Sequence, residues 1–406
     1  MKTNIARQPI FNEKNDTIAY KLLFRSFEKN NNSAIFNDGS KATTEVIKNW
    51  LINFGLEKLT NNKRAFITFT ESLLLQKMPQ LLRKDSFTIE LEPSLEISDE
   101  LLESIIELKS EGYNFALTAN QLDKIEENSK NLIEVVKIDF IHNSYNEIKE
   151  ISKIYQSKNF ILFAEKIETI EAFQLAKDLD FKMFQGYYFE KPTILETNKL
   201  STIPTVYLQL LEELNKKESN SKRLAEITKN DVTLTYSVLN IVNSVAYYSR
   251  RRIKSLKDAY TRLGMKESKK IIYFNFLKTM TPNDTPNELV RKSLIRGKQA
   301  ELLSSSFDLS EKRECLFLLG LLSLINIILK DDMSKIIKRI HLSDEISEAL
   351  LGKKNHLSNI LDIIILYERN YEQAFLKKIN EESLDLEIFS ETYLEALLWS
   401  DSIFEA

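Results

Sequence analysis

Residues 5–25 read Ile5-Ala-Arg-Gln-Pro-Ile-Phe-Asn-Glu-Lys-Asn-Asp-Thr-Ile-Ala-Tyr-Lys-Leu-Leu-Phe-Arg25. Two β-rich segments, Ile5–Phe11 and Thr17–Arg25, lie on either side of a short polar linker. This linker is too short for the crossover helix that joins parallel strands, so the two segments are predicted to form an antiparallel hairpin.

β-rich and amphipathic helical segments alternate after this hairpin, which is typical of a sheet with its helices outside. Eight strands in about 190 residues predict a compact α/β barrel, similar to a TIM barrel but irregular because one strand is antiparallel. The expected strands are Ile5–Phe11, Thr17–Arg25, Arg64–Thr70, Ser86–Glu92, Asn114–Ala119, Val135–Phe140, Asn159–Glu165 and Met183–Phe189. The expected helices among them are Thr43–Phe54, Asp99–Glu111, Tyr145–Gln156 and Ile170–Leu179.

The β pattern stops after Pro192, and later segments have helical spacing. We therefore expect an all-α second domain, with domain boundaries at 1–195 and 196–406 and a linker at Thr193–Ser201. The expected helices are Ala225–Asn230, Leu234–Tyr248, Leu256–Leu263, Lys266–Met280, Asn287–Ser305, Arg313–Lys330, Asp344–Leu351 and Leu357–Tyr371.

Charge, apolar runs and cysteine count exclude several classes of protein. The chain has 56 basic and 59 acidic residues and a formal net charge of −3, so no overall attraction to nucleic acid or to an anionic membrane is expected. The most apolar run, Cys315–Leu329, is shorter than the roughly 20 residues that span a bilayer. The start of the chain lacks a signal-peptide pattern, and a single cysteine excludes an internal disulfide, so a cytoplasmic protein is expected.

Acidic residues follow several of the expected strands. Glu90, Glu92, Asp139 and Glu165 lie near strand ends, and Lys137 lies two residues before Asp139. Barrel enzymes place working residues at the carboxyl ends of strands, where converging acids can bind a divalent metal. The alternative is that these acids are solvated or paired with lysines, and spacing alone leaves both interpretations open.

Five motifs resemble the successive signatures of EAL domains. They are Arg7–Phe11, Ala19–Arg25, Val136–Asp139, Phe163–Glu168 and Phe184–Pro192, in the family's order. EAL domains are phosphodiesterases of cyclic diguanylate (cyclic di-GMP) with an irregular barrel fold. The resemblance therefore implies both that fold and a connection to cyclic di-GMP.

The resemblance also implies roles for single residues. Arg25 stands where the family contacts the substrate phosphate, Gln8 and Gln185 stand at polar positions of the substrate site, and Lys137 stands at the lysine associated with the hydrolytic water. The matched acids, at three metal-ligand positions and one supporting position, are Glu90, Asp139, Glu165 and Glu168.

Other matched positions depart from the family. Lys21 replaces the glutamate of the naming motif, Thr68 replaces a metal-ligating asparagine, and Thr118 and Ala119 replace an aspartate pair. The second acid of the Glu90 motif is also displaced, although a shift in register would let Glu92 take its place.

These replacements argue against catalysis. Magnesium needs oxygen ligands and cannot use an ammonium group. A lysine charge about 4 Å from a divalent ion costs roughly 8 kcal/mol at an effective dielectric constant near 20. We therefore expect no bound metal or other cofactor and no metal-dependent hydrolysis. Lys21 is hypothesised to pair with Glu90 or Asp139 in place of the metal; the alternative is a lysine merely tolerated in a decayed site.

The second half contains four stretches that together carry a further resemblance: Arg223–Asp231, Leu239–Tyr247, Ile253–Ala259 and Arg262–Gly264. They resemble the HDOD domain, a helical relative of the HD phosphohydrolases that lacks their metal-binding residues. Asn243 and Ser244 are expected to hold a helix junction by hydrogen bonds. Three scattered histidines, His142, His341 and His356, have no metal-ligand spacing. Two further stretches, Phe317–Ile325 and Leu342–Gly352, resemble the matching parts of two-part EAL-HDOD proteins.

Three hypotheses of function follow. The leading one is a non-catalytic bacterial signalling protein that acts through protein partners, and the resemblance allows a homodimer. The first alternative is an inactive receptor that binds cyclic di-GMP through Gln8, Arg25 and Gln185. The second is a weak residual phosphodiesterase that uses the matched acids and Lys137.

Overall fold

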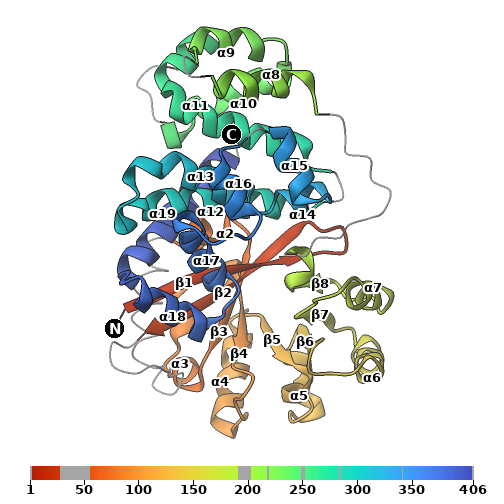
Figure 1. Ribbon diagram of the computed structural model, residues 1–406. Helices are drawn as coiled ribbons and strands as arrows, with labels where there is room; N and C mark the ends of the chain where they lie inside the picture. Colours follow the sequence, from red (N-terminus) through yellow and green to blue (C-terminus); the bar gives the residue numbers. More distant parts are fainter. Residues whose placement is uncertain are drawn as a thin grey trace. The chain divides into compact units, whose positions relative to one another are not determined.

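The computed structural model describes residues 2–27, 55–190, 203–216, 219–247, 252–282, 285–340 and 342–404, with side chains described in these ranges except at 2–4, 24–27 and 189–190. The chain divides into two compact units, Met1–Lys191 and Pro192–Ala406 (Figure 1). The expected helix Thr43–Phe54 and the expected linker Thr193–Ser201 lie outside the described residues.

The first unit is a closed barrel whose strands follow one another in chain order (Figure 1). β1 runs antiparallel to both of its neighbours, β2 and β8, and the remaining neighbouring pairs are parallel. The prediction of an irregular eight-stranded barrel is therefore confirmed. The strands are β1 (Lys2–Phe11), β2 (Thr17–Phe27), β3 (Arg64–Phe69), β4 (Phe87–Leu91), β5 (Phe115–Thr118), β6 (Val135–Asp139), β7 (Ile161–Glu165) and β8 (Met183–Phe184).

The turn between β1 and β2 explains why these two strands run antiparallel to each other. The Asn12 side-chain oxygen accepts hydrogen bonds from the backbone N–H groups of Lys14 and Asp16, both at 2.9 Å. Asn15 takes a left-handed backbone with φ of 65°, which asparagine tolerates better than most residues. The turn therefore reverses the chain without a crossover helix.

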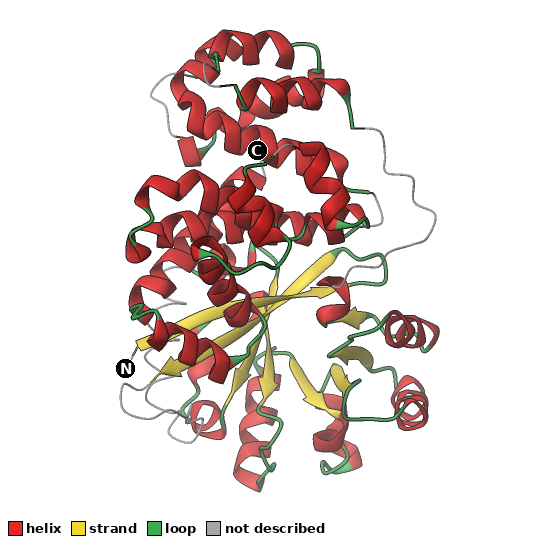
Figure 2. Ribbon diagram, in the orientation of Figure 1, coloured by secondary structure: helices red, strands yellow, loops and turns green. Residues whose placement is uncertain are grey.

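Helices cover the outside of the barrel strands (Figure 2). Ser98, Ser144 and Thr169 cap the N-termini of three helices, each accepting a hydrogen bond from a backbone N–H three residues later. Inside the barrel, Phe66 and Phe163 pack edge to face and are fully buried. The described α-helices of this unit are α2 (Leu56–Thr60), α3 (Glu71–Leu75), α4 (Asp99–Ser110), α5 (Ala119–Leu122), α6 (Tyr145–Gln156) and α7 (Ile170–Asp178).

The second unit is helical throughout its described residues, as predicted. The helix α12 lies in its core, because most of the residues along it are buried. The helices are α8 (Thr205–Leu214), α9 (Ser221–Thr228), α10 (Val232–Val242), α11 (Leu256–Met280), α12 (Asn287–Leu303), α13 (Arg313–Leu322), α14 (Ile325–Leu329), α15 (Met333–Ile340), α16 (Asp344–Leu350), α17 (His356–Glu368), α18 (Glu372–Glu381) and α19 (Leu386–Phe404). Within the described ranges, none of them combines the length and apolarity needed to cross a membrane.

Two predicted helices of this unit are wrong in extent. The helix predicted at Leu234–Tyr248 ends at Val242, because the side chain of Asn243 bonds to the backbone of a later segment. The helix predicted at Arg313–Lys330 is divided into α13 and α14 after Leu322. Apolar periodicity continues across both points, so it does not reveal either break.

Candidate functional site

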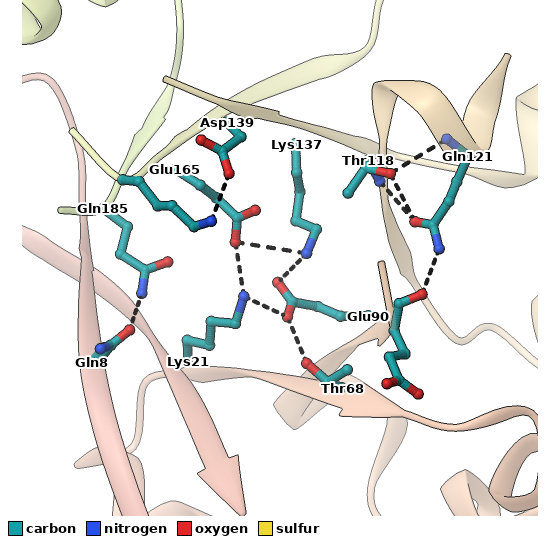
Figure 3. Close-up of polar contacts among 12 residues, drawn as sticks. Gln8, Lys21, Thr68, Glu90, Thr118, Gln121, Lys137, Asp139, Glu165 and Gln185 are labelled. Atoms are coloured by element: carbon teal, nitrogen blue, oxygen red, sulfur yellow. Dashed lines mark hydrogen bonds and ion pairs between the residues drawn. The ribbon is translucent and has the colours of Figure 1, made fainter. Parts of the chain in front are cut away.

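Four strands of the barrel bring two lysines and two glutamates together (Figure 3). Lys21 comes from β2, Glu90 from β4, Lys137 from β6 and Glu165 from β7. We call these four residues the Lys–Glu square. Their strands are separated along the chain, but barrel closure points their side chains toward one another.

The square is held by ion pairs in which each lysine contacts both glutamates. Lys21 Nζ lies 2.8 Å from Glu165 Oε1 and 3.1 Å from Glu90 Oε2. Lys137 Nζ lies 3.2 Å from Glu90 Oε1 and 3.6 Å from Glu165 Oε1. The side chains of Glu90 and Lys137 are 0% and 1% exposed, whereas those of Lys21 and Glu165 are 16% and 13% exposed. Two positive and two negative charges thus cancel in a nearly dry site.

The electrostatics of the square keep Lys21 and Glu165 ionised. Burial by itself lowers the pKa of Lys21, but the carboxylates of Glu165 and Glu90 outweigh it, so the pKa lies above its ordinary value of 10.5. Burial likewise tends to raise the pKa of Glu165, but the charges of Lys137 and Lys21 hold that pKa at about 2. Both groups are therefore charged at neutral pH.

The other replaced positions do not supply a carboxylate to the square. Thr68 Oγ1 donates a hydrogen bond of 3.0 Å to Glu90 Oε2 and so orients that glutamate. Thr118 caps α5 in a reciprocal arrangement with Gln121, and Ala119 is the first residue of that helix. Thr68 therefore belongs to the site, whereas Thr118 and Ala119 form a helix start.

Asp139 lies beside the square but has partners of its own. Its Oδ2 lies 2.7 Å from Lys166 Nζ and 2.8 Å from His142 Nδ1, and its Oδ1 accepts hydrogen bonds from the backbone N–H groups of Ile141 and His142. Burial opposes its charge, but Lys166, His142 and these N–H groups hold the pKa of Asp139 at about 2. These four contacts occupy the hydrogen-bond acceptor positions of the Asp139 carboxylate.

The hypothesis that Lys21 pairs with Glu90 or Asp139 is confirmed at Glu90. Glu165, which the hypothesis did not name, is a second partner of Lys21. Sequence reasoning also missed Lys166, which neutralises Asp139. Lys166 has a left-handed backbone with φ of 60°, a conformation that is uncommon for lysine and that spacing does not reveal.

The remaining predicted residues lie around the square. Gln185 Nε2 donates a hydrogen bond of 2.5 Å to Gln8 Oε1, which joins β1 to the segment after β8. Glu168 is half-buried in the loop between β7 and α7. The register between β3 and β4 is regular, with Thr68 opposite Glu90. The shift in register that would let Glu92 take the place of the displaced acid is therefore not found between these two strands. The side chain of Arg25 lies outside the described residues.

The residues present do not fit the divalent ions that the EAL resemblance implies. The ammonium of Lys21 occupies the point on which Glu90 and Glu165 converge, and Asp139 is held by Lys166. In the described part of the chain, no three His, Cys, Asp or Glu side chains form a group that could hold a metal ion. A metal between Glu90 and Glu165 requires displacement of Lys21.

The pKa of Glu165 predicts how acid affects the barrel. Because this pKa is depressed from 4.5 to about 2 in the folded state, the stabilisation is present above pH 4.5 and is lost as the pH falls toward 2. Lys21, with a raised pKa, stays charged throughout this range. We expect Glu165→Gln to flatten the decline of unfolding free energy between about pH 5 and 2, measured by urea unfolding. Parallel declines in both proteins would contradict this assignment.

The expected helix junction in the second unit is confirmed. The Asn243 side chain donates to the carbonyl oxygens of Leu239 and Ile253, and its oxygen accepts from the N–H of Ile253 at 2.8 Å. Ser244 Oγ donates to the carbonyl of Ile241. Asn243 therefore ends α10 and fixes the return of the chain toward α11, which is a structural role.

The histidines take no part in a metal group within the described residues. His142 bonds to Asp139, and His356 is the first residue of α17. His341 lies outside the described residues.

Comparison with known proteins agrees with this two-unit organisation. The EAL domain model matches residues 7–192, and the HDOD domain model matches residues 200–354. An EAL domain protein of Listeria monocytogenes has a similar crystal structure, 17% identical over 46% of this chain and 87% of its own, with a TM-score of 0.36.

Two relatives match over both units. YuxH of Bacillus subtilis is 35% identical over 100% of both chains. Cyclic di-GMP phosphodiesterase CdgJ of Vibrio cholerae is 28% identical over 99% of this chain and 93% of its own. With an EAL barrel followed by an HDOD helical domain, and with YuxH related to it from end to end, the chain belongs to the family of two-domain EAL-HDOD proteins.

Proposed function

We propose that this chain is a non-catalytic protein of cyclic di-GMP signalling that acts by contacts with a protein partner. The observation that carries the proposal is the position of Lys21, 2.8 Å from Glu165 and 3.1 Å from Glu90. The relative CdgJ is named a cyclic di-GMP phosphodiesterase, which supports the signalling context. The Lys–Glu square supports the loss of catalysis.

Hydrolysis of a phosphodiester needs an activated water and positive charge on the phosphate oxygens. Metal ions supply both, because they lower the pKa of bound water and neutralise charge that develops in the transition state. In the square, the ammonium groups of Lys21 and Lys137 are already neutralised by Glu90 and Glu165. The site therefore offers neither strong general base nor excess positive charge to the substrate.

The test is incubation of the purified full chain with cyclic di-GMP and either Mg²⁺ or Mn²⁺, with chromatographic measurement of linear dinucleotide. We expect no product above the level formed by Glu165→Gln, a variant that keeps the shape of the side chain. Metal-stimulated cleavage by the natural chain that disappears in Glu165→Gln would reject the proposal. It would support the alternative of a residual phosphodiesterase.

The receptor alternative is favoured by one observation. Gln8 and Gln185, at positions that the EAL resemblance assigns to the substrate site, are joined by a hydrogen bond at the edge of the square. Calorimetric titration with cyclic di-GMP in the absence of metal tests this function. Binding without cleavage, weakened by Gln185→Ala and by Arg25→Ala, supports a receptor. If no heat of binding is detected at high cyclic di-GMP concentration, the receptor alternative is rejected and the proposed function through protein contacts remains.

A further inference from the structure

Three carboxylates near the carboxyl ends of the barrel strands, those of Glu90, Asp139 and Glu165, each face an ammonium group from another strand or loop. Glu90 and Glu165 face Lys21 and Lys137 (Figure 3). Asp139 faces Lys166. These contacts differ in burial, because Lys166 is 52% exposed whereas Lys21 is 16% exposed. Lys21 is also the lysine that lies closest to both glutamates of the square.

We infer that Lys21 is a built-in cation that holds closed a latent divalent-metal site formed by Glu90 and Glu165. This residue alone then sets whether the rim captures a metal ion. The inference rests on the proposed function in one respect, which is that the natural chain works without a bound metal.

Geometry supports this inference. Oxygens of Glu90 and Glu165 lie 3.1 and 2.8 Å from one nitrogen, so two carboxylates from different strands already converge on one point. Divalent cations bind oxygens at roughly 2.0–2.6 Å, so a cation at this point needs only a small contraction of the site. Thr68 already orients the Glu90 carboxylate. What the site lacks is a third acid, and β2 presents residue 21 at the same point.

The other two lysines do not have this role. Lys137 lies farther from both glutamates than Lys21 does, at 3.2 Å from Glu90 Oε1 and 3.6 Å from Glu165 Oε1. Lys166 neutralises Asp139, whose other oxygen is already held by the backbone N–H groups of Ile141 and His142. Replacing either of them leaves the ammonium of Lys21 between the two glutamates.

The test is Mn²⁺ titration of the full chain without nucleotide, by calorimetry and by thermal unfolding. We expect Lys21→Glu to bind Mn²⁺ more than about 100-fold tighter than the natural chain, because it exchanges a repelling charge for a ligand. Its unfolding temperature is expected to rise with Mn²⁺. Lys153→Glu makes the same charge change on the exposed surface of α6 and is expected to leave Mn²⁺ binding unchanged.

Two results would overturn the inference. One is a folded Lys21→Glu variant with Mn²⁺ affinity equal to that of the natural chain. The other is tight Mn²⁺ binding by the natural chain that Glu165→Gln abolishes, since the site is then open. If Lys21→Glu does not fold, Lys21→Gln is measured instead, with an expected gain of about 10-fold because only the repulsion is removed. Nucleotide is absent, so these outcomes are independent of whether the natural chain cleaves cyclic di-GMP.

Discussion

Lys21→Met is expected to lower the free energy of unfolding of the barrel by about 3–5 kcal/mol, because it removes one partner from a buried ionic cluster. Methionine keeps the unbranched stem of the side chain without its ammonium group and leaves Glu90 and Glu165 sharing one ammonium, that of Lys137. Glu90 is fully buried, so water cannot replace the lost charge. One of the two glutamates must then take up a proton or move, and either change costs stability.

The measurement must separate the barrel from the helical unit. Hydrogen exchange followed by mass spectrometry in increasing urea reads the amides of β4 and β7 directly, in the full chain. Lys166→Met is the matched control, because it makes the same substitution on the same rim at a half-exposed ion pair. Its expected cost is roughly 0–1 kcal/mol.

This experiment also decides between the two interpretations that the sequence leaves open for Lys21. A large loss of stability means that the lysine has become part of the structure in place of a metal. Equal, small losses in Lys21→Met and Lys166→Met mean a lysine merely tolerated in a decayed site, and they contradict the stabilising role. The surrounding geometry favours the first interpretation, because Lys21 contacts two carboxylates and not one.

The sequence predicted the barrel well because its signals are local. The short linker after Phe11 forces the hairpin, and each later strand is marked by its own β-rich run. The members of the site were also found, because Glu90, Lys137 and Glu165 stand at the carboxyl half of their strands. The pairing of these residues with Lys21 is harder to predict from the sequence, since Lys21 and Glu165 are 144 residues apart and meet only through barrel closure.

Of the two partners expected for Lys21, Asp139 is held elsewhere, for a local reason that spacing does not show. The chain turns sharply after β6, so the N–H groups of Ile141 and His142 point at Asp139 and fix its carboxylate. Lys166 then reaches Asp139 from a left-handed backbone. Both features depend on loop conformation, to which periodicity of apolar residues is insensitive.

Gly320→Ala is expected to destabilise the helical unit by about 3 kcal/mol or more, because the helices α12 and α13 touch through backbone atoms at this point. A Cβ atom on Gly320 meets the carbonyl carbon and oxygen of Arg296 and the nitrogen of Gly297, each at 2.5 Å. Backbone atoms of a core helix cannot rotate away as a side chain does, so the two helices must separate.

Separation of α12 and α13 would also disturb the contacts of Arg296 on α12. Arg296 is buried and donates hydrogen bonds to Glu368 on α17 and to Ser323 after α13, so a shift of α12 strains ionic contacts in a dry interior. Hydrogen exchange of the α12 amides in urea measures the loss. Gly352→Ala is the control, because Gly352 has φ of 83° and open space around it, so alanine there costs only about 1–2 kcal/mol in conformation. Gly320 lies within the helix α13 and has no left-handed backbone, so a loss no larger than that of Gly352→Ala would contradict the close helix contact as the reason that glycine is needed there.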